Sequence, residues 1–221
     1  MNIANLARLR QGCYRLFGAL FLYPDKERLT TLLISAEELE KESESLEAFP
    51  FFESLKQLLT TLHKLAEGEM LEVEEEYISL FMVNPKAPPY ESFYIDPQRQ
   101  NTGWIAVQLE REYAEKGLVL SPSLGELPDH AAVELEFMSF LCRQEFSALE
   151  KEALQDLIHV LKQQHAFLVQ HLDQWFNIFA KRVKGMAQKR FYGVLVEATN
   201  AFIHNDLVLL NLLIEEVQEW T

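Results

Sequence analysis

The spacing of the apolar residues constrains the fold more than any other feature of this chain. Between residues 3 and 22 they recur at about every third or fourth position, which places them on one face of a helix. The same spacing returns over residues 52–65, 71–81 and 102–116, and no run alternates convincingly as a strand would. We therefore expect an all-α fold, a single helical-bundle domain over residues 1–221 with roughly nine to eleven helices.

Capping and breaking residues predict where several helices begin and end. Asp25 follows a Tyr-Pro pair and suits the cap of a short second helix, and Gly117 suits the end of a later helix. Ser147 is expected to cap a long helix that runs through His171. Asp206 is expected to cap the last helix, so the segment before it should end near position 205.

Two loops interrupt the helical pattern. Residues 82–97 contain four prolines and three aromatic residues, which excludes a regular helix there and favours an ordered loop. Residues 118–130 form the second loop, and Pro128 and Asp129 suit the first turn of the helix that follows. The two loops mark residues 82–130 as the candidate hinge region of the domain.

The charge of the chain is negative and unevenly spread. The formal net charge is −14, and residues 36–76 hold thirteen Glu, no Asp and three Lys. Such a surface disfavours nucleic acid and anionic membranes and suits a basic partner. For any single Glu in this segment, a solvated helix face that keeps the protein soluble is the simpler interpretation.

The N-terminal segment and the cysteines predict a cytoplasmic protein. The apolar run from Leu16 to Pro24 is too short to span a bilayer and has no small-residue cleavage site. Cys13 and Cys142 match no zinc or redox spacing, so we expect two reduced thiols in the core.

Common catalytic motifs are missing from the sequence, and one cluster contains residue types suited to chemistry. No phosphate-binding loop, dinucleotide-binding glycine motif, HExxH helix or GxSxG turn is present. The cluster comprises Glu126, Asp129, His130, Glu134 and Glu136. His130 and Glu134 have a spacing that can bind a metal, Asp129 and His130 suit an acid/base pair, and the same groups can bind a cationic peptide. Taken alone, the cluster is best explained as the start of a helix.

Two further groups of residues have alternative interpretations. Tyr90, Phe93 and Tyr94 either hold the proline-rich loop against the core or line an apolar groove for a peptide. The basic residues between Lys181 and Arg190 are best explained as a helix end that neutralises nearby acids, and a contact with an acidic client or anionic cofactor is the alternative.

Several segments, in this order, resemble the TorD/DmsD/NarJ family of redox-enzyme maturation chaperones. They are residues 76–81 (EYISLF), 88–94 (PPYESFY), 126–130 (ELPDH) with 134–138 (ELEFM), and 191–206 (FYGVLVEATNAFIHND). The resemblance covers most of the chain and implies an all-helical, non-enzymatic chaperone without a cofactor or metal of its own.

The resemblance also implies a partner and a site. The expected partner is the twin-arginine signal peptide and apoprotein of a molybdopterin redox enzyme, bound until export, with help in cofactor-dependent maturation. The client would be a reductase for N-oxides, sulfoxides or nitrate, or a formate dehydrogenase, and the chaperone a monomer or a domain-swapped dimer. The residues expected to bind the signal peptide are Glu126, Asp129, His130, Tyr90, Ser92 and Tyr94.

Two other functions compete with this expectation. One is a helical metal-dependent hydrolase that uses Asp129, His130 and Glu134. The other is a general interaction scaffold without specificity for a signal peptide.

Overall fold

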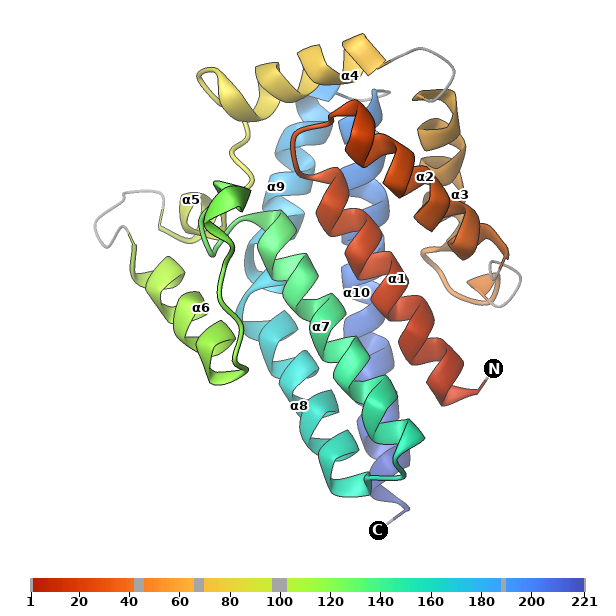
Figure 1. The fold of residues 1–221 in the computed structure, drawn as a ribbon. Coiled ribbons are helices and arrows are strands. Elements are labelled where there is room, and N and C mark those ends of the chain that lie inside the picture. The colour runs from red at the N-terminus through yellow and green to blue at the C-terminus, as the bar shows by residue number, and fades with distance from the viewer. Residues whose placement is uncertain (1, 42–45, 66–69, 97–102, 188–189, 221) are drawn as a thin grey trace.

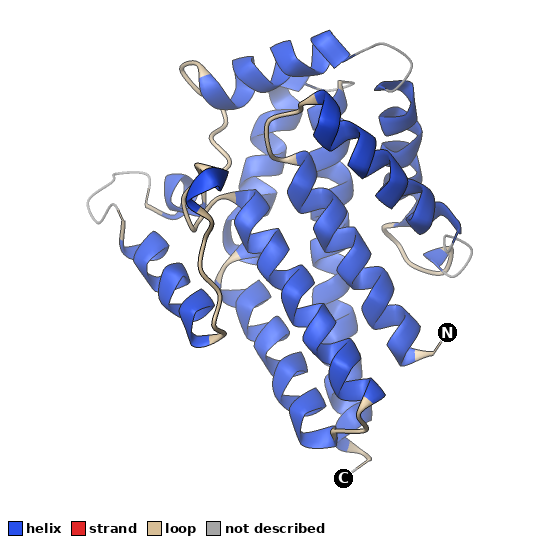
Figure 2. Cartoon of the chain, viewed as in Figure 1, coloured by secondary structure: helices blue, strands red, loops and turns tan. Residues whose placement is uncertain are grey.

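The described part of the chain consists of helices joined by loops and turns. The computed structural model describes residues 2–41, 46–65, 70–96, 103–187 and 190–220. These residues contain ten α-helices, which confirms the expected all-α class and helix count (Figure 2). Their bounds are α1 (Ile3–Leu20), α2 (Lys26–Lys41), α3 (Phe52–Lys64), α4 (Met70–Tyr77), α5 (Glu91–Ile95), α6 (Trp104–Glu115), α7 (Ala131–Glu150), α8 (Leu154–Gln170), α9 (Leu172–Ala187) and α10 (Phe191–Gln218).

Five long helices make the centre of the molecule, and the shorter helices surround it. Figure 1 shows α1, α7, α8, α9 and α10 together as a bundle. Helices α2 and α3 lie on one side of it, α4 crosses one end, and α5 and α6 lie on the opposite side (Figure 1). No helix in the described ranges is long and apolar enough to cross a membrane.

Helices α1 and α7 approach each other closely because of a glycine. A Cβ atom placed on Gly18 would lie 3.1 Å from the carbonyl oxygen of Ala132 and 3.3 Å from the Cβ atom of Leu135. The Ser139 hydroxyl donates to the Gln11 carbonyl oxygen at 3.3 Å, further along the same pair of helices. Position 18 thus faces positions 132–135 and position 11 faces position 139, so the two helices run antiparallel.

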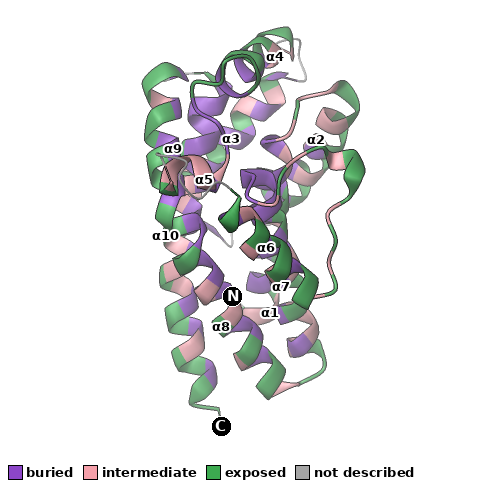
Figure 3. Cartoon of the chain, turned by 90° about the vertical axis from the view of Figure 1, so that its left-hand side faces the viewer, coloured by how far each residue is buried: buried purple, intermediate pink, exposed green. Residues whose placement is uncertain are grey.

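The segment that joins α6 to α7 runs over the surface of the bundle and packs three half-buried leucines against it. Residues Leu118–Leu124, which we call the strap, include a 3₁₀ turn at Pro122–Leu124. Figure 3 shows that the connection between α6 and α7 runs along the outside of the bundle and has few buried positions. Leu118, Leu120 and Leu124 are half-buried, whereas Val119 is 91% exposed.

Three helix boundaries differ from those expected. Asp25 caps α2, as predicted, because its side chain accepts a hydrogen bond from the Arg28 N–H at 2.8 Å, but α2 reaches Lys41 and is not short. The expectation that Ser147 caps a helix was wrong: it lies within α7, and the break comes after Glu150. The expectation that Asp206 begins the last helix was also wrong, since α10 continues through it.

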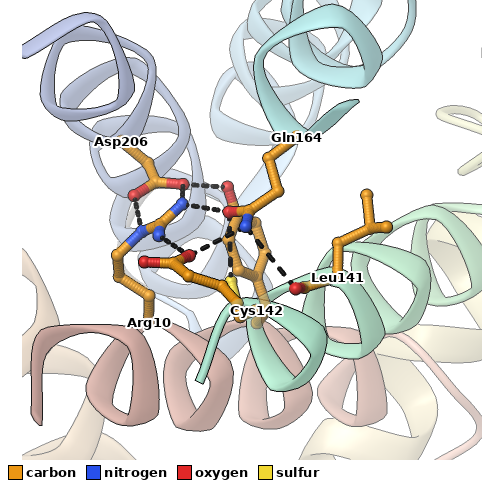
Figure 4. A network of polar contacts seen from close by, with 7 residues as sticks. Arg10, Leu141, Cys142, Gln164 and Asp206 are labelled. Carbon is orange, nitrogen blue, oxygen red and sulfur yellow. Dashed lines mark hydrogen bonds and ion pairs between the residues drawn. The ribbon is translucent and has the colours of Figure 1, made fainter. Parts of the chain in front are cut away.

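Asp206 remains within a helix because it has a buried partner in α1. Its carboxylate accepts hydrogen bonds from the Arg10 guanidinium at 2.5 and 3.0 Å and from the Tyr14 hydroxyl at 2.7 Å. Arg10 also donates to Glu145 at 2.6 Å and to Gln164 (Figure 4). Arg10 is 2% exposed and both carboxylates are fully buried. One guanidinium therefore links α1, α7, α8 and α10.

Both cysteines lie in this region of the core as free, buried thiols, as expected. Burial raises the pKa of Cys142 well above its usual value. The Cys142 Sγ atom lies 3.5 Å from the Gln164 amide oxygen, so it belongs to the same polar network (Figure 4).

Removal of Arg10 should destabilise the whole bundle. Arg10→Ala leaves two buried carboxylates without their cation, and we expect a loss of about 3–5 kcal/mol in the free energy of unfolding measured with urea. Arg8→Ala is the matched control, because Arg8 is exposed and lies over the Phe146 ring, 5.4 Å from its centroid. We expect the control to lose about 1 kcal/mol or less. Equal losses in the two variants would show that the network does not hold the helices together.

Candidate functional site

The proline-rich loop and the start of α7 form one junction. The Ala131 N–H donates to the Pro89 carbonyl oxygen at 2.8 Å, and the Glu91 N–H donates to the Asp129 carbonyl oxygen at 2.9 Å. These two bonds make an isolated antiparallel bridge between Tyr90 and His130. Two of the segments that carry the sequence resemblance are therefore in direct contact, although about forty residues separate them in the sequence.

The side chains of Asp129 and His130 each cap a helix at this junction. Oδ2 of Asp129 accepts the Ser92 N–H at 3.1 Å, in the first turn of α5. Nδ1 of His130 accepts the Ala132 N–H at 3.1 Å, so His130 is the N-cap of α7. Asp129 is fully buried and His130 is 1% exposed. Burial lowers the pKa of His130 to about 3, which keeps the imidazole neutral and able to accept.

Glu126 and Tyr90 lie on the outer side of the same junction. The Tyr90 hydroxyl donates to Oε2 of Glu126 at 2.5 Å, and burial together with this bond raises the pKa of Tyr90. The Glu126 side chain keeps 20% of its exposure, and it lies 3.8 Å from Nε2 of His130. It lines a surface hollow of about 280 Å³, which we call the Glu126 hollow. The other residues lining the hollow are Leu22, Tyr23, Arg28, Ser121, Ser123 and Leu124.

Tyr94 and Phe93 attach the loop to α9. The Tyr94 ring stacks on Trp175 with centroids 5.6 Å apart and contacts Phe179 at 5.9 Å. The Arg182 guanidinium lies 5.3 Å from the centroid of Phe93 and donates to the Lys86 carbonyl oxygen at 2.5 Å. For Tyr94, these contacts favour the interpretation that the aromatic residues hold the loop against the core over the interpretation that they line a peptide groove.

Residues 76–81, the first of the segments that carry the sequence resemblance, contact the start of α10. The Glu76 carboxylate accepts the Tyr192 N–H at 3.4 Å, in the first turn of a helix whose N-cap, Arg190, makes no side-chain cap. Burial raises the pKa of Glu76 to about 7. The Tyr77 ring contacts Tyr192 at 5.7 Å and Tyr23 at 5.5 Å, which connects this segment to the edge of the Glu126 hollow. After Tyr77 the helix widens into a π-helical turn at Ile78–Met82.

A buried ionic cluster that sequence reasoning missed lies behind the junction. His171 lies at 2.9 Å from Glu91 on one side and 3.4 Å from Glu112 on the other. Burial opposes the charged imidazolium, yet the hydrogen bonds to the two carboxylates raise the pKa of His171 to about 9. His171 therefore joins α5 and α6 to the turn between α8 and α9. In the sequence, His171 follows His159 and His165 at intervals of six residues, and this spacing does not predict a contact with two glutamates.

Glu134 is held in the same buried region. Its Oε2 accepts the Trp175 indole N–H at 3.1 Å. Burial and the nearby Glu91 raise the pKa of Glu134 well above the usual value.

The three groups considered as metal ligands have separate partners. Asp129 binds the Ser92 N–H, His130 the Ala132 N–H, and Glu134 the indole of Trp175. Among the residues that the structure describes, no group of three or more His, Cys, Asp or Glu side chains could hold a metal ion. These three side chains therefore do not form the set of metal ligands that a helical metal-dependent hydrolase would need.

The charge of His171 should make stability depend on pH. A folded-state pKa of about 9 against an ordinary value of 6.5 means that the stabilisation is complete below pH 6.5 and is lost as pH rises through 9. We expect the free energy of unfolding to fall over this window by on the order of 2–3 kcal/mol.

The matched variant for this prediction is His171→Gln. The amide keeps a hydrogen-bond donor but cannot titrate, so the decline between pH 6.5 and 9 should largely disappear in the variant. Parallel stability curves for wild type and variant would show that His171 is not the titrating group.

Comparison with known proteins gives consistent matches. A family model described as nitrate reductase delta subunit matches residues 47–181. A TorD chaperone from Psychrobacter is 29% identical over 92% of this chain and 91% of its own length, and one from Vibrio cholerae is 30% identical over 73% and 74%. A perchlorate reductase assembly chaperone from Dechloromonas aromatica is 28% identical over 59% of this chain and 58% of its own.

A solved structure agrees in fold. A crystal structure from Archaeoglobus fulgidus, described as a redox enzyme maturation protein, matches with a TM-score of 0.53 and 24% identity. The match covers 88% of this chain and 93% of that one.

Proposed function

This chain belongs to the TorD/NarJ family of redox-enzyme maturation chaperones, and we propose that it binds the twin-arginine signal peptide of a molybdopterin redox-enzyme precursor. The binding takes place in the cytoplasm, before export, and keeps the precursor there while its cofactor is inserted. Family membership supports a redox-enzyme partner, and the perchlorate reductase chaperone among its relatives is consistent with one.

The single observation that carries the proposal is the position of Glu126. Its carboxylate is partly exposed in a surface hollow, next to Tyr90 and beside Tyr23, which is 39% exposed. Leu127, the next residue, is 58% exposed. This combination suits an arginine side chain, because its guanidinium forms charge-assisted bonds with a carboxylate and its planar face stacks on aromatic rings.

The six residues expected to bind the peptide divide into two groups. Glu126 lines the hollow and Tyr90 donates its hydroxyl to the Glu126 carboxylate, and these two are the ones we assign to direct contact. Asp129 and His130 are buried and cap α5 and α7, Ser92 donates its N–H to Asp129, and Tyr94 packs on Trp175. We assign these four to positioning, since they fix the loop that presents Tyr90 to Glu126.

The overall charge favours the same partner. A net charge of −14 attracts a cationic segment over distances of about 10 Å at moderate salt. The affinity should therefore decrease as salt is added.

Substitutions that remove charge but keep hydrogen bonding separate contact from positioning. We expect Glu126→Gln to weaken binding of a synthetic twin-arginine leader about tenfold in titration calorimetry, since a charged pair is lost. We expect Asp129→Asn to change it less than about threefold, because an amide oxygen still accepts the Ser92 N–H. Glu53→Gln, at an exposed position of α3, is the control and should change nothing.

Two results would contradict the proposal. Unchanged affinity in Glu126→Gln would remove the carboxylate on which the site depends. Equal losses in Glu126→Gln and Asp129→Asn would place Asp129 in direct contact with the leader and refute the division into contact and positioning residues.

A further inference from the structure

A second and larger groove opens beside the Glu126 hollow. It lies between α1, α7 and the strap and has a volume of about 610 Å³. Its walls are mainly apolar, with Leu118, Leu120, Phe137 and Phe140 among them. Leu22, Ser121 and Leu124 line both the groove and the Glu126 hollow, so the two spaces adjoin.

The helices that form the groove define its length. The α7 residues that line it begin at Ala132 and end at Arg143, which at 1.5 Å per residue is about 16 Å. Because α1 runs antiparallel, Leu22 lies at the Ala132 end and Gln11 at the Arg143 end. An extended peptide of about five residues covers this distance.

The strap offers an edge to an extended chain. In the described part of the chain, residues 119–123 make no backbone hydrogen bond to α1 or α7. Half-buried Leu118 and Leu120 alternate with exposed Val119, as in an extended segment, and Ser121 has extended backbone angles of φ −68° and ψ 126°. Unpaired backbone groups along an extended segment can pair with an added peptide.

The two ends of this path differ in charge. At the hollow, Glu126 is available, whereas Arg28 is engaged by Asp25 at 3.5 Å. At the far end, the groove is lined by Arg143. Arg15, which lies 3.9 Å from Glu38, and Glu136, the one acid among the residues that line the groove, lie between the two ends. A peptide with a cationic front is therefore favoured with that front at Glu126 and disfavoured in the reverse direction.

We propose that this groove takes the apolar residues that directly follow the arginines of the leader. About five of them lie extended between α7 and the strap, and the chain runs from Glu126 toward Arg143. The inference rests on the proposed function and adds to it the route and direction of the bound segment.

Paired variants of α7 test the groove separately from the arginine site. Phe140 lines the groove, and the Arg143 guanidinium lies 5.3 Å from its ring centroid. Phe146 on the same helix is also half-buried beneath an arginine, Arg8, but is not among the residues lining the groove. We expect Phe140→Ser to weaken a full leader about tenfold and Phe146→Ser to leave it within about twofold. A peptide cut after its arginines should bind wild type and both variants equally.

Equal affinity of Phe140→Ser and Phe146→Ser for the full leader, with Glu126→Gln still weakened, would overturn the groove and leave the proposed function intact. Absence of leader binding in wild type would overturn both the groove and the proposed function.

Photo-crosslinking tests the route without any variant of the protein. A benzoylphenylalanine at the fifth residue after the second arginine of the leader should crosslink to residues 136–143 or 11–15. Crosslinks confined to α4 or residues 78–83 would overturn the route.

Discussion

The capping of both α5 and α7 by two neighbouring residues, Asp129 and His130, is the interaction on which the candidate site depends. Asp129 caps one helix with its side chain, His130 caps the other, and two backbone hydrogen bonds join the loop at Tyr90 to the start of α7. Each cap satisfies an N–H that has no partner within its own helix. The consequence for function is geometric, because this junction brings Tyr90 within 2.5 Å of Glu126.

Buried charge supports the junction from behind and organises the bundle beneath it. His171 with its two glutamates joins α5 and α6 to the α8–α9 turn, and Arg10 with Asp206 and Glu145 links four helices. Buried ion pairs contribute little net stability compared with well-packed apolar residues, but breaking one is costly. Such pairs therefore specify which helices meet, and the apolar stripes supply most of the free energy of folding.

Local patterns predicted the helices well and their long-range partners poorly. The stripe over residues 3–22 became α1, and Asp25 caps α2, because both depend on neighbours within a few positions. Ser147 and Asp206 are residue types that favour caps, yet tertiary contacts override that preference at Asp206, which Arg10 holds inside α10. Likewise, sequence named Asp129 and His130 as peptide-binding candidates but gave no sign that they are buried. The hinge expected at residues 82–130 stays a prediction.

We propose that the chain holds a redox-enzyme precursor by its uncleaved leader. Isolation of the tagged protein from its native cells, followed by mass spectrometry of the bound partner, tests this most directly. We expect one large redox subunit that still carries its twin-arginine leader, and loss of that subunit when Glu126 is replaced by Gln. Recovery of only leader-free enzyme, or of the same partners with and without the Glu126 carboxylate, would contradict it.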